Sequence, residues 1–236
     1  MPMYFVIRIK NHLKKRLPPN SKSYALARWA YGKIFFPLQH SAWRRQDKPA
    51  AKPGPFNRRS ELYMCSLFPK ELLDFVIGTF RPASALDVGC GTGVSLEYFL
   101  QHGVDAVGLE GSDLAIKYSG VGQRIVKHDL SHPAELGRTF DFVWCHDVAE
   151  HIPEIAADTL VATICRHGRQ VFFSAGIPGE AGQGHVNEQF PAYWIQKFKK
   201  LGFAPDPATD RVRHLKGAAN ALIFTRSTWA LGQTPE

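Results

Sequence analysis

The 236-residue chain carries 29 Lys and Arg against 21 Asp and Glu, and 44% of its residues are hydrophobic. This composition supports a packed core and excludes a disordered chain, and the length suits one catalytic-size domain plus a short extension. The charge is uneven, because residues 1–60 hold 14 of the basic residues and a single acid, Asp47. We therefore predict a basic N-terminal extension and linker at residues 1–58, followed by one domain at residues 59–236.

Several classes of protein are excluded by what the sequence lacks. No apolar run approaches the ~18–20 residues that cross a bilayer. The N-terminus places apolar residues before charge, which is the reverse of a secretory signal. The four cysteines form no C-x-x-C pair, as expected for reduced thiols rather than a disulfide framework. These features predict a cytoplasmic protein.

The basic extension combines helical apolar spacing at residues 1–42 with a Pro-rich linker at residues 46–57. Its basic and aromatic side chains allow three interpretations. Residues 1–45 could lie on an anionic membrane surface, which would place the protein peripherally at the inner membrane. They could follow a nucleic-acid backbone, an interpretation that we favour less. They could also form a lid over the site of the following domain.

Beyond the linker, a helix is predicted at residues 59–79, divided by Pro69. Short apolar runs then alternate with helical stretches, the pattern of a parallel sheet covered on both faces. The predicted helices cover residues 93–102, 113–119, 154–167 and 191–201. The predicted strands are Ala85–Val88, Ala106–Leu109, Arg124–Lys127, Phe142–Cys145, Gln170–Ser174 and Ala219–Thr225. We therefore predict an α/β doubly wound domain.

A glycine-rich turn follows the first strand, in the pattern Asp87-x-Gly89-x-Gly91-x-Gly93. Glycines allow a tight turn there and let a ligand approach bare peptide groups. The dinucleotide fingerprint G-x-G-x-x-G is not met, because Val94 occupies its last position. The acid before the first glycine is unsuited to a pyrophosphate but suits a ligand with an ammonium and a sulfonium group.

This pattern resembles motif I of the class I S-adenosylmethionine-dependent methyltransferases. The resemblance extends over residues 84–225 and implies a Rossmann-like, mostly parallel sheet of about seven strands. It implies S-adenosylmethionine as cofactor, with Glu110 on the ribose hydroxyls, Asp129 on the adenine amino group and the end of the fourth strand beside the methyl donor. The cofactor-binding residues that it implies are Asp87, Gly89, Cys90, Gly91, Gly93, Glu110, Asp129, Leu130 and His146.

A group of acids and histidines follows the fourth strand, in the segment His146–Pro153. If residues 147–151 form a helical turn, Asp147, Glu150 and His151 share one face. With His185 from the loop after the fifth strand, they could bind Mg²⁺ or Mn²⁺. Alternatively, His185, His151 and Glu150 act without metal as catalytic base or substrate ligands, or the segment only starts a helix.

The acid-x-x-Glu-His segment resembles two metal-dependent branches of the superfamily, the ubiquinone-pathway O-methyltransferases and the small-RNA 3′-terminal 2′-O-methyltransferases. Here the first acid is Asp147, where those branches usually carry Glu. His185 is the preferred catalytic candidate, because a histidine in a glycine-rich loop is expected to be accessible to an acceptor.

The sequence thus predicts an S-adenosylmethionine-dependent methyltransferase (EC 2.1.1.-) acting on a hydroxyl of a small-molecule or glycan-type acceptor. The segment at residues 176–202 resembles the corresponding region of bacterial methyltransferases that act on such acceptors. Two alternatives stay open. One is an enzyme similar to RNA 2′-O-methyltransferases that uses the basic arm, and the other is a catalytically silent scaffold protein that binds S-adenosylmethionine.

Overall fold

The computed structural model describes Leu62 and residues 68–180, 182 and 184–227. The predicted basic extension and the proposed domain boundary at residue 58 lie outside these residues, as do the membrane and nucleic-acid interpretations of residues 1–45. No helix in the described part of the chain is long and apolar enough to cross a bilayer.

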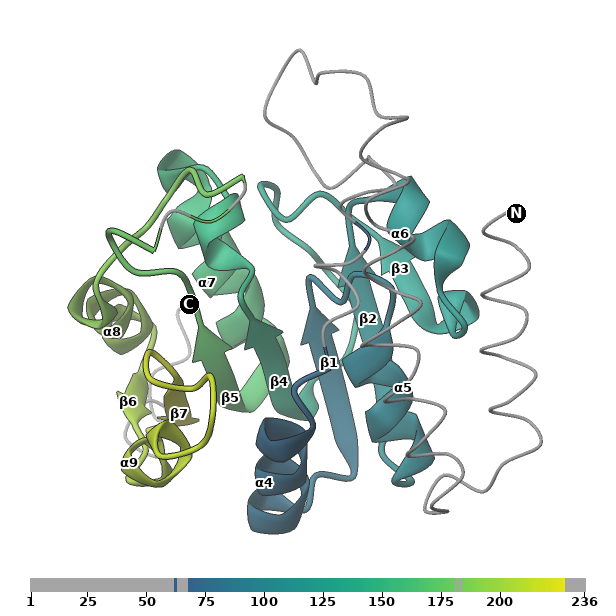
Figure 1. Ribbon diagram of the computed structural model, residues 1–236, viewed down its shortest axis with the longest axis horizontal. Coiled ribbons are helices and arrows are strands. Elements are labelled where there is room, and N and C mark those ends of the chain that lie inside the picture. Colours follow the sequence, from purple (N-terminus) through teal and green to yellow (C-terminus); the bar gives the residue numbers. More distant parts are fainter. Residues whose placement is uncertain (1–61, 63–67, 181, 183, 228–236) are drawn as a thin grey trace, which may run out of the picture.

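The core of the fold is a seven-stranded sheet in the order β3-β2-β1-β4-β5-β7-β6 (Figure 1). β3, β2, β1, β4 and β5 run parallel to one another, whereas β7 runs antiparallel to both β5 and β6. The strands are β1 (Ser84–Val88), β2 (Asp105–Glu110), β3 (Ile125–Lys127), β4 (Phe140–His146), β5 (Gly168–Ser174), β6 (Phe203–Pro205) and β7 (Leu222–Arg226).

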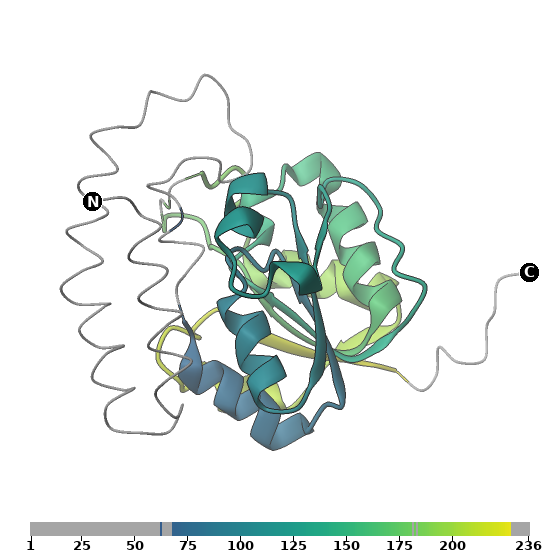
Figure 2. The same ribbon diagram turned by 90° about the vertical axis from the view of Figure 1, so that its right-hand side faces the viewer.

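Helices pack on both faces of the sheet, with α7 on one side and α4 and α5 on the other (Figure 2). The α-helices are α4 (Lys70–Phe80), α5 (Val94–Gln101), α6 (Asp113–Tyr118), α7 (Ala157–His167), α8 (Pro191–Lys200) and α9 (Ala208–Arg213). Between α6 and α7 the described residues also form the short 3₁₀ helices η3 (Gly122–Arg124), η4 (Ala149–His151) and η5 (Glu154–Ala156).

Alternating side chains of the central strands supply the two hydrophobic cores. In β4, Val143 and Cys145 join the core under α7 and α8, whereas Phe142 and Trp144 join the core under α4, α5 and α9. Successive strand residues point to opposite faces, and both faces are covered here. This is why the central strands read as continuous apolar runs in the sequence.

The predicted α/β doubly wound sheet with helices on both faces is confirmed, and each predicted apolar run overlaps a strand. α4 begins directly after Pro69, as expected from a residue that disrupts a helix interior. Two elements near the C-terminus were not located from the sequence. β6 has only three residues and ends in Pro205, and α9 has only six.

One local prediction was wrong. Residues 147–151 do not form a continuous helical turn, because Asp147 has a φ of 52° and the 3₁₀ helix η4 begins only at Ala149. The Asp147 N–H donates to the backbone oxygen and to Oγ of Ser174, both at 3.1 Å, and the Ser174 hydroxyl donates to Oδ1 of Asp147 at 2.7 Å. These contacts with the end of β5 hold Asp147 in the left-handed region.

Candidate active site

The glycine-rich turn lies between the end of β1 and the start of α5. Gly89, Gly91 and Gly93 all have positive φ values, which side chains with a Cβ rarely adopt. Gly89 is also restricted by space, since a Cβ there would lie 2.5 Å from Cγ2 of Val148. Both constraints explain why this turn needs glycine.

Asp87 lies just before the turn and is 2% exposed. Its Oδ2 atom has no hydrogen-bond partner among the described residues. Burial, with the nearby charge of Glu110, raises the pKa of Asp87 to about 8. Buried polar atoms in proteins are nearly always paired. Oδ2 of Asp87 is therefore available to a hydrogen-bond donor that enters the turn.

Glu110, the last residue of β2, ties the turn to the neighbouring strand. The Gly91 N–H donates to Oε2 of Glu110 at 2.7 Å, and the Ser112 N–H donates to Oε1 at 2.7 Å. Burial raises the pKa of Glu110, while these N–H donors oppose the shift. A carboxylate oxygen can accept more than one hydrogen bond, so both oxygens of Glu110 can still accept hydrogen bonds from a ligand.

The other predicted cofactor residues lie at the carboxyl ends of the strands or just beyond them. Asp129 follows β3, is exposed and accepts a hydrogen bond from the Ser131 N–H at 2.9 Å, which lowers the pKa of Asp129. Leu130 is buried next to it. Cys90 is also buried, and its Sγ occupies the space beside Gly108, where a Cβ would lie 2.6 Å away.

His146 ends β4 and packs against aromatic rings of the sheet. Its ring is stacked on that of Trp144, with the centroids 5.5 Å apart, and is tilted against that of Phe172 at 5.9 Å. Burial lowers the pKa of His146, so that the ring favours its neutral form. This ring contributes an apolar surface rather than a fixed charge.

Three of the four predicted metal or catalytic residues converge. Ligand atoms of Glu150, His151 and His185 all lie within 4.8 Å of one another, and Asp147 is not part of this group. Nε2 of His185 is 4.0 Å from Oε1 of Glu150, and the two histidine rings meet edge to face with centroids 5.0 Å apart. We call these three side chains the Glu–His–His cluster.

The backbone of Glu150 joins the two segments that carry this cluster. Its carbonyl oxygen accepts hydrogen bonds from the Val186 N–H at 2.8 Å and the Asn187 N–H at 3.1 Å. The Glu150 side chain is buried, and its Oε2 atom has no hydrogen-bond partner in the described part of the chain. Burial, with the nearby charge of Asp147, raises the pKa of Glu150 to about 8. Burial also lowers the pKa of His151.

Sequence reasoning gave no role to Glu188, which contacts the cluster through His185. Oε1 of Glu188 lies 2.8 Å from Nδ1 of His185. The spacing His-x-x-Glu in one loop was the only signal available, and such spacing is common among solvated loop residues. The contact is defined by how the loop folds back on η4.

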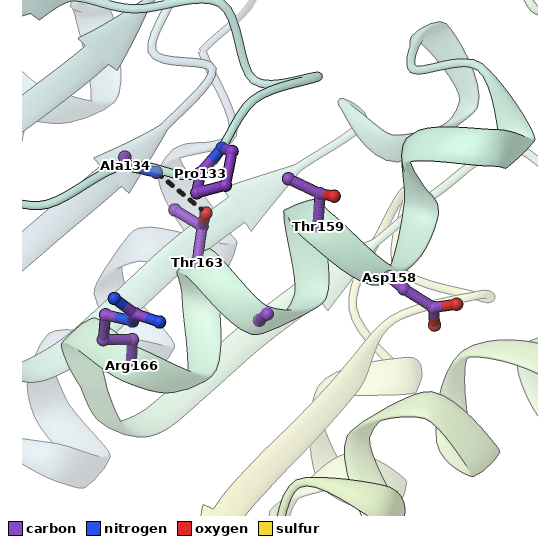
Figure 3. Close-up of a pocket in the computed structure, with 7 residues that line it drawn as sticks. Pro133, Ala134, Asp158, Thr159, Thr163 and Arg166 are labelled. Atoms are coloured by element: carbon purple, nitrogen blue, oxygen red, sulfur yellow. Dashed lines mark hydrogen bonds between the residues drawn. The ribbon is translucent and has the colours of Figure 1, made fainter.

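A cavity of about 300 Å³ lies elsewhere, on the outer side of α7 (Figure 3). It is bounded by Pro133 and Ala134 on one side and by α7 on the other, and the Ala134 N–H donates to Oγ1 of Thr163 at 3.3 Å. None of the predicted site residues lines it. The cavity is therefore separate from the site at the carboxyl edge of the sheet.

The strand order and the glycine-rich turn define a class I S-adenosylmethionine-dependent methyltransferase domain. A family model described as a methyltransferase domain matches residues 56–204, which is more than half of the chain. The chain therefore belongs to this methyltransferase domain family, and the resemblance seen in motif I is confirmed.

Curated relatives include the ubiquinone biosynthesis O-methyltransferase of Aromatoleum aromaticum. It is 31% identical over 117 residues, which cover 46% of this chain and 46% of that protein. The ubiquinone biosynthesis O-methyltransferase of Klebsiella pneumoniae is 27% identical over 158 residues, covering 56% of this chain and 63% of that protein. The chain thus spans about half to two thirds of the length of these relatives.

Among solved structures, the sugar N-methyltransferase of Streptoalloteichus sp. matches with a TM-score of 0.59 at 18% identity. The match covers 77% of this chain and 98% of that one. The magnesium protoporphyrin IX methyltransferase of Synechocystis, solved with bound S-adenosylhomocysteine, has a TM-score of 0.55 at 17% identity and covers 86% and 100%. At these identities the two structures show a shared fold.

Proposed function

We propose that this chain transfers the methyl group of S-adenosylmethionine to a hydroxyl group of a small-molecule or glycan-type acceptor. The observation that carries the proposal is the arrangement at one sheet edge. The glycine-rich turn and the unpartnered oxygen of Asp87 follow β1, and the Glu–His–His cluster is built on the segments after β4 and β5. β4 lies between β1 and β5, so the two parts of the site are neighbours.

The residues of the turn fit S-adenosylmethionine. Asp87 offers a buried carboxyl oxygen to a cationic ligand, the glycines allow close approach of the backbone, and Glu110 is positioned to accept from ribose hydroxyls. Asp129 and Leu130 would border the adenine, while Cys90 and His146 complete the lining. When bound, S-adenosylmethionine supplies an electrophilic methyl group, whose bond to sulfur breaks as the acceptor oxygen attacks.

The role of His185 is to take the hydroxyl proton of the acceptor at Nε2, so that the acceptor oxygen becomes a better nucleophile. Oε1 of Glu150 lies 4.0 Å from this nitrogen, and the His151 ring meets the His185 ring edge to face. We propose that both side chains position the acceptor. The relatives support a small acceptor, because they include an O-methyltransferase of ubiquinone biosynthesis and a sugar N-methyltransferase.

A second proposed use of the cluster is to bind Mg²⁺ or Mn²⁺, which would lower the pKa of the acceptor hydroxyl. It is favoured by the unpartnered Oε2 atom of the buried Glu150 and by the mixed oxygen and nitrogen donors. Asp147 lies outside the cluster and is held by Ser174, so we propose three protein ligands rather than four.

The test is calorimetric titration of S-adenosylhomocysteine into the full chain, first with EDTA and then with Mg²⁺ or Mn²⁺, followed by turnover with sugar and phenolic acceptors. His185→Ala should keep the affinity for S-adenosylhomocysteine and lose roughly 100-fold or more in turnover. His102→Ala is the matched control, because this exposed histidine follows α5 at the opposite edge of the sheet. A fully active His185→Ala variant would refute the role of His185, and a folded chain that does not bind S-adenosylhomocysteine would refute the proposed function.

A further inference from the structure

The imidazole of His185 is held on one edge by a carboxylate. Nδ1 of His185 lies 2.8 Å from Oε1 of Glu188, and the other oxygen of Glu188 accepts a hydrogen bond from the Gly179 N–H at 3.0 Å. The side chains of His185 and Glu188 are 15% and 21% exposed. One carboxylate thus serves two donors from the same loop, and the side chains of His185 and Glu188 are largely shielded from water.

Two glycines lie close to atoms of the His185 ring. A Cβ on Gly182 would lie 2.0 Å from Nε2 and 2.2 Å from Cε1 of His185. A Cβ on Gly176 would lie 2.7 Å from Cε1 and 2.9 Å from Nδ1. Neither glycine has a positive φ, so the reason for glycine at both positions is the space that the ring occupies. We call Gly176, Gly182 and Glu188 the imidazole slot.

The contact with Glu188 determines which ring nitrogen carries hydrogen. An ionised carboxylate only accepts hydrogen bonds, so the neutral ring must carry its hydrogen on Nδ1. Nε2 then keeps its lone pair, and this is the nitrogen 4.0 Å from Oε1 of Glu150. His151 is arranged in the same way, because its Nδ1 lies 3.2 Å from the carbonyl oxygen of Gly184, which also can only accept.

We infer that Glu188 is a positioning residue that holds His185, within the imidazole slot, as the Nδ1–H tautomer with Nε2 facing Glu150. The expected effect of Glu188 on turnover rests on the proposed function, since Nε2 of His185 is the atom proposed to take the acceptor proton. The placement itself does not depend on that function, because a divalent cation would also need the lone pair on Nε2.

The substitution Glu188→Gln tests this placement with little change in shape. The Gln carbonyl oxygen can still accept from the Gly179 N–H, which directs its NH₂ group toward Nδ1 of His185. A donor at that position requires Nδ1 to accept, so the ring must move its hydrogen to Nε2. The variant keeps both hydrogen bonds and reverses the tautomer. Glu180→Gln is the matched control, because Glu180 accepts from the Ile177 N–H in the same loop.

The experiment is ¹⁵N NMR of the histidine rings in the full chain at a pH where they are neutral. The signals of His185 are assigned among the 10 histidines by their loss in His185→Asn. We expect the Nδ1–H pattern in the wild type and in Glu180→Gln, and the Nε2–H pattern in Glu188→Gln. Turnover of Glu188→Gln should fall roughly 10- to 100-fold, with KM and the affinity for S-adenosylhomocysteine within about twofold of wild type.

The outcomes separate this inference from the proposed function. An Nε2–H wild type, or an unchanged tautomer in Glu188→Gln, overturns the inference whatever the turnover. A reversed tautomer with full turnover overturns the positioning role. A wild type that turns over no acceptor counts against the proposed function, while the tautomer still decides the placement.

Gly182→Ala provides a second route if Glu188→Gln does not fold. The added methyl group must displace the His185 ring, so we expect a change in its ¹⁵N pattern or line width and a loss of turnover. Gly78→Ala is the control, since a Cβ on that glycine of α4 would meet nothing within 4 Å. Wild-type spectra and turnover in Gly182→Ala would contradict the inference that the His185 ring packs against Gly182.

Discussion

Binding of S-adenosylhomocysteine should release a proton from Asp87. Burial raises the pKa of this carboxyl group to about 8, so the ligand-free protein holds it protonated at pH 7. The ammonium group of the ligand favours the carboxylate and lowers its pKa. If the carboxylate forms completely, about 0.9 of a proton leaves per molecule bound at pH 7 and almost none at pH 9.5.

Two quantities follow from the same pKa. The affinity should rise about tenfold per pH unit up to pH 8 and level off above it. In the ligand-free protein, the unfolded state ionises Asp87 near its ordinary pKa of 3.8, whereas the native state holds the proton to about pH 8. Stability therefore falls as the pH rises through this range. The loss is at most roughly 6 kcal/mol, an upper limit because water entering an open site reduces the cost of burying charge.

The assay is calorimetry at pH 7 in phosphate and in Tris, whose ionisation enthalpies differ. The dependence of the observed binding enthalpy on the buffer gives the number of protons released. Asp87→Asn is the control, because the Asn amide does not titrate. Any proton released by Glu110 is still released in this variant. This variant should release fewer protons, bind more weakly and lose less stability between pH 4 and pH 8. Equal proton release by the wild type and Asp87→Asn would refute the reasoning.

Three further predictions concern the turn and the core. Gly89→Ala should lower the free energy of unfolding by about 1–3 kcal/mol in urea, because its Cβ would lie 2.5 Å from Val148, and unchanged stability would contradict this steric restriction. Leu160→Ala should cost about 2–5 kcal/mol with unchanged affinity for S-adenosylhomocysteine, since Leu160 is fully buried away from the turn, and a weaker affinity would contradict that separation. Glu110→Ala should weaken the binding of S-adenosylhomocysteine at least about tenfold, as measured by calorimetry. Wild-type affinity in this variant would exclude Glu110 as a ligand of the ribose hydroxyls.

The sequence was sufficient for the fold class because its strongest signals are local. The central strands are buried on both faces, so they appear as largely apolar runs such as Phe142–Cys145. The glycines of the turn are equally local, since their positive φ values exclude most other residues wherever the ligand lies. Family resemblance in motif I then gave the class of domain.

Short edge elements carried too little of this signal. β6 pairs only with β7 and exposes Ala204 and Pro205, so its burial pattern does not distinguish it from a loop. The backbone at Asp147 was mispredicted for a related reason. Its left-handed conformation is fixed by hydrogen bonds to Ser174, 27 residues away, and no pattern around residue 147 indicates them.

The sequence by itself determined the sheet, the turn and the kinds of residue at the site, because periodicity and backbone conformation are set by neighbours along the chain. The tertiary structure decided which of these residues meet. It brought His185 to Glu150 and His151, left Asp147 outside the cluster, and joined Glu188, Gly176 and Gly182 around one imidazole ring. These contacts depend on how the loop after β5 folds back onto the 3₁₀ helix after β4, which is a property of packing in three dimensions.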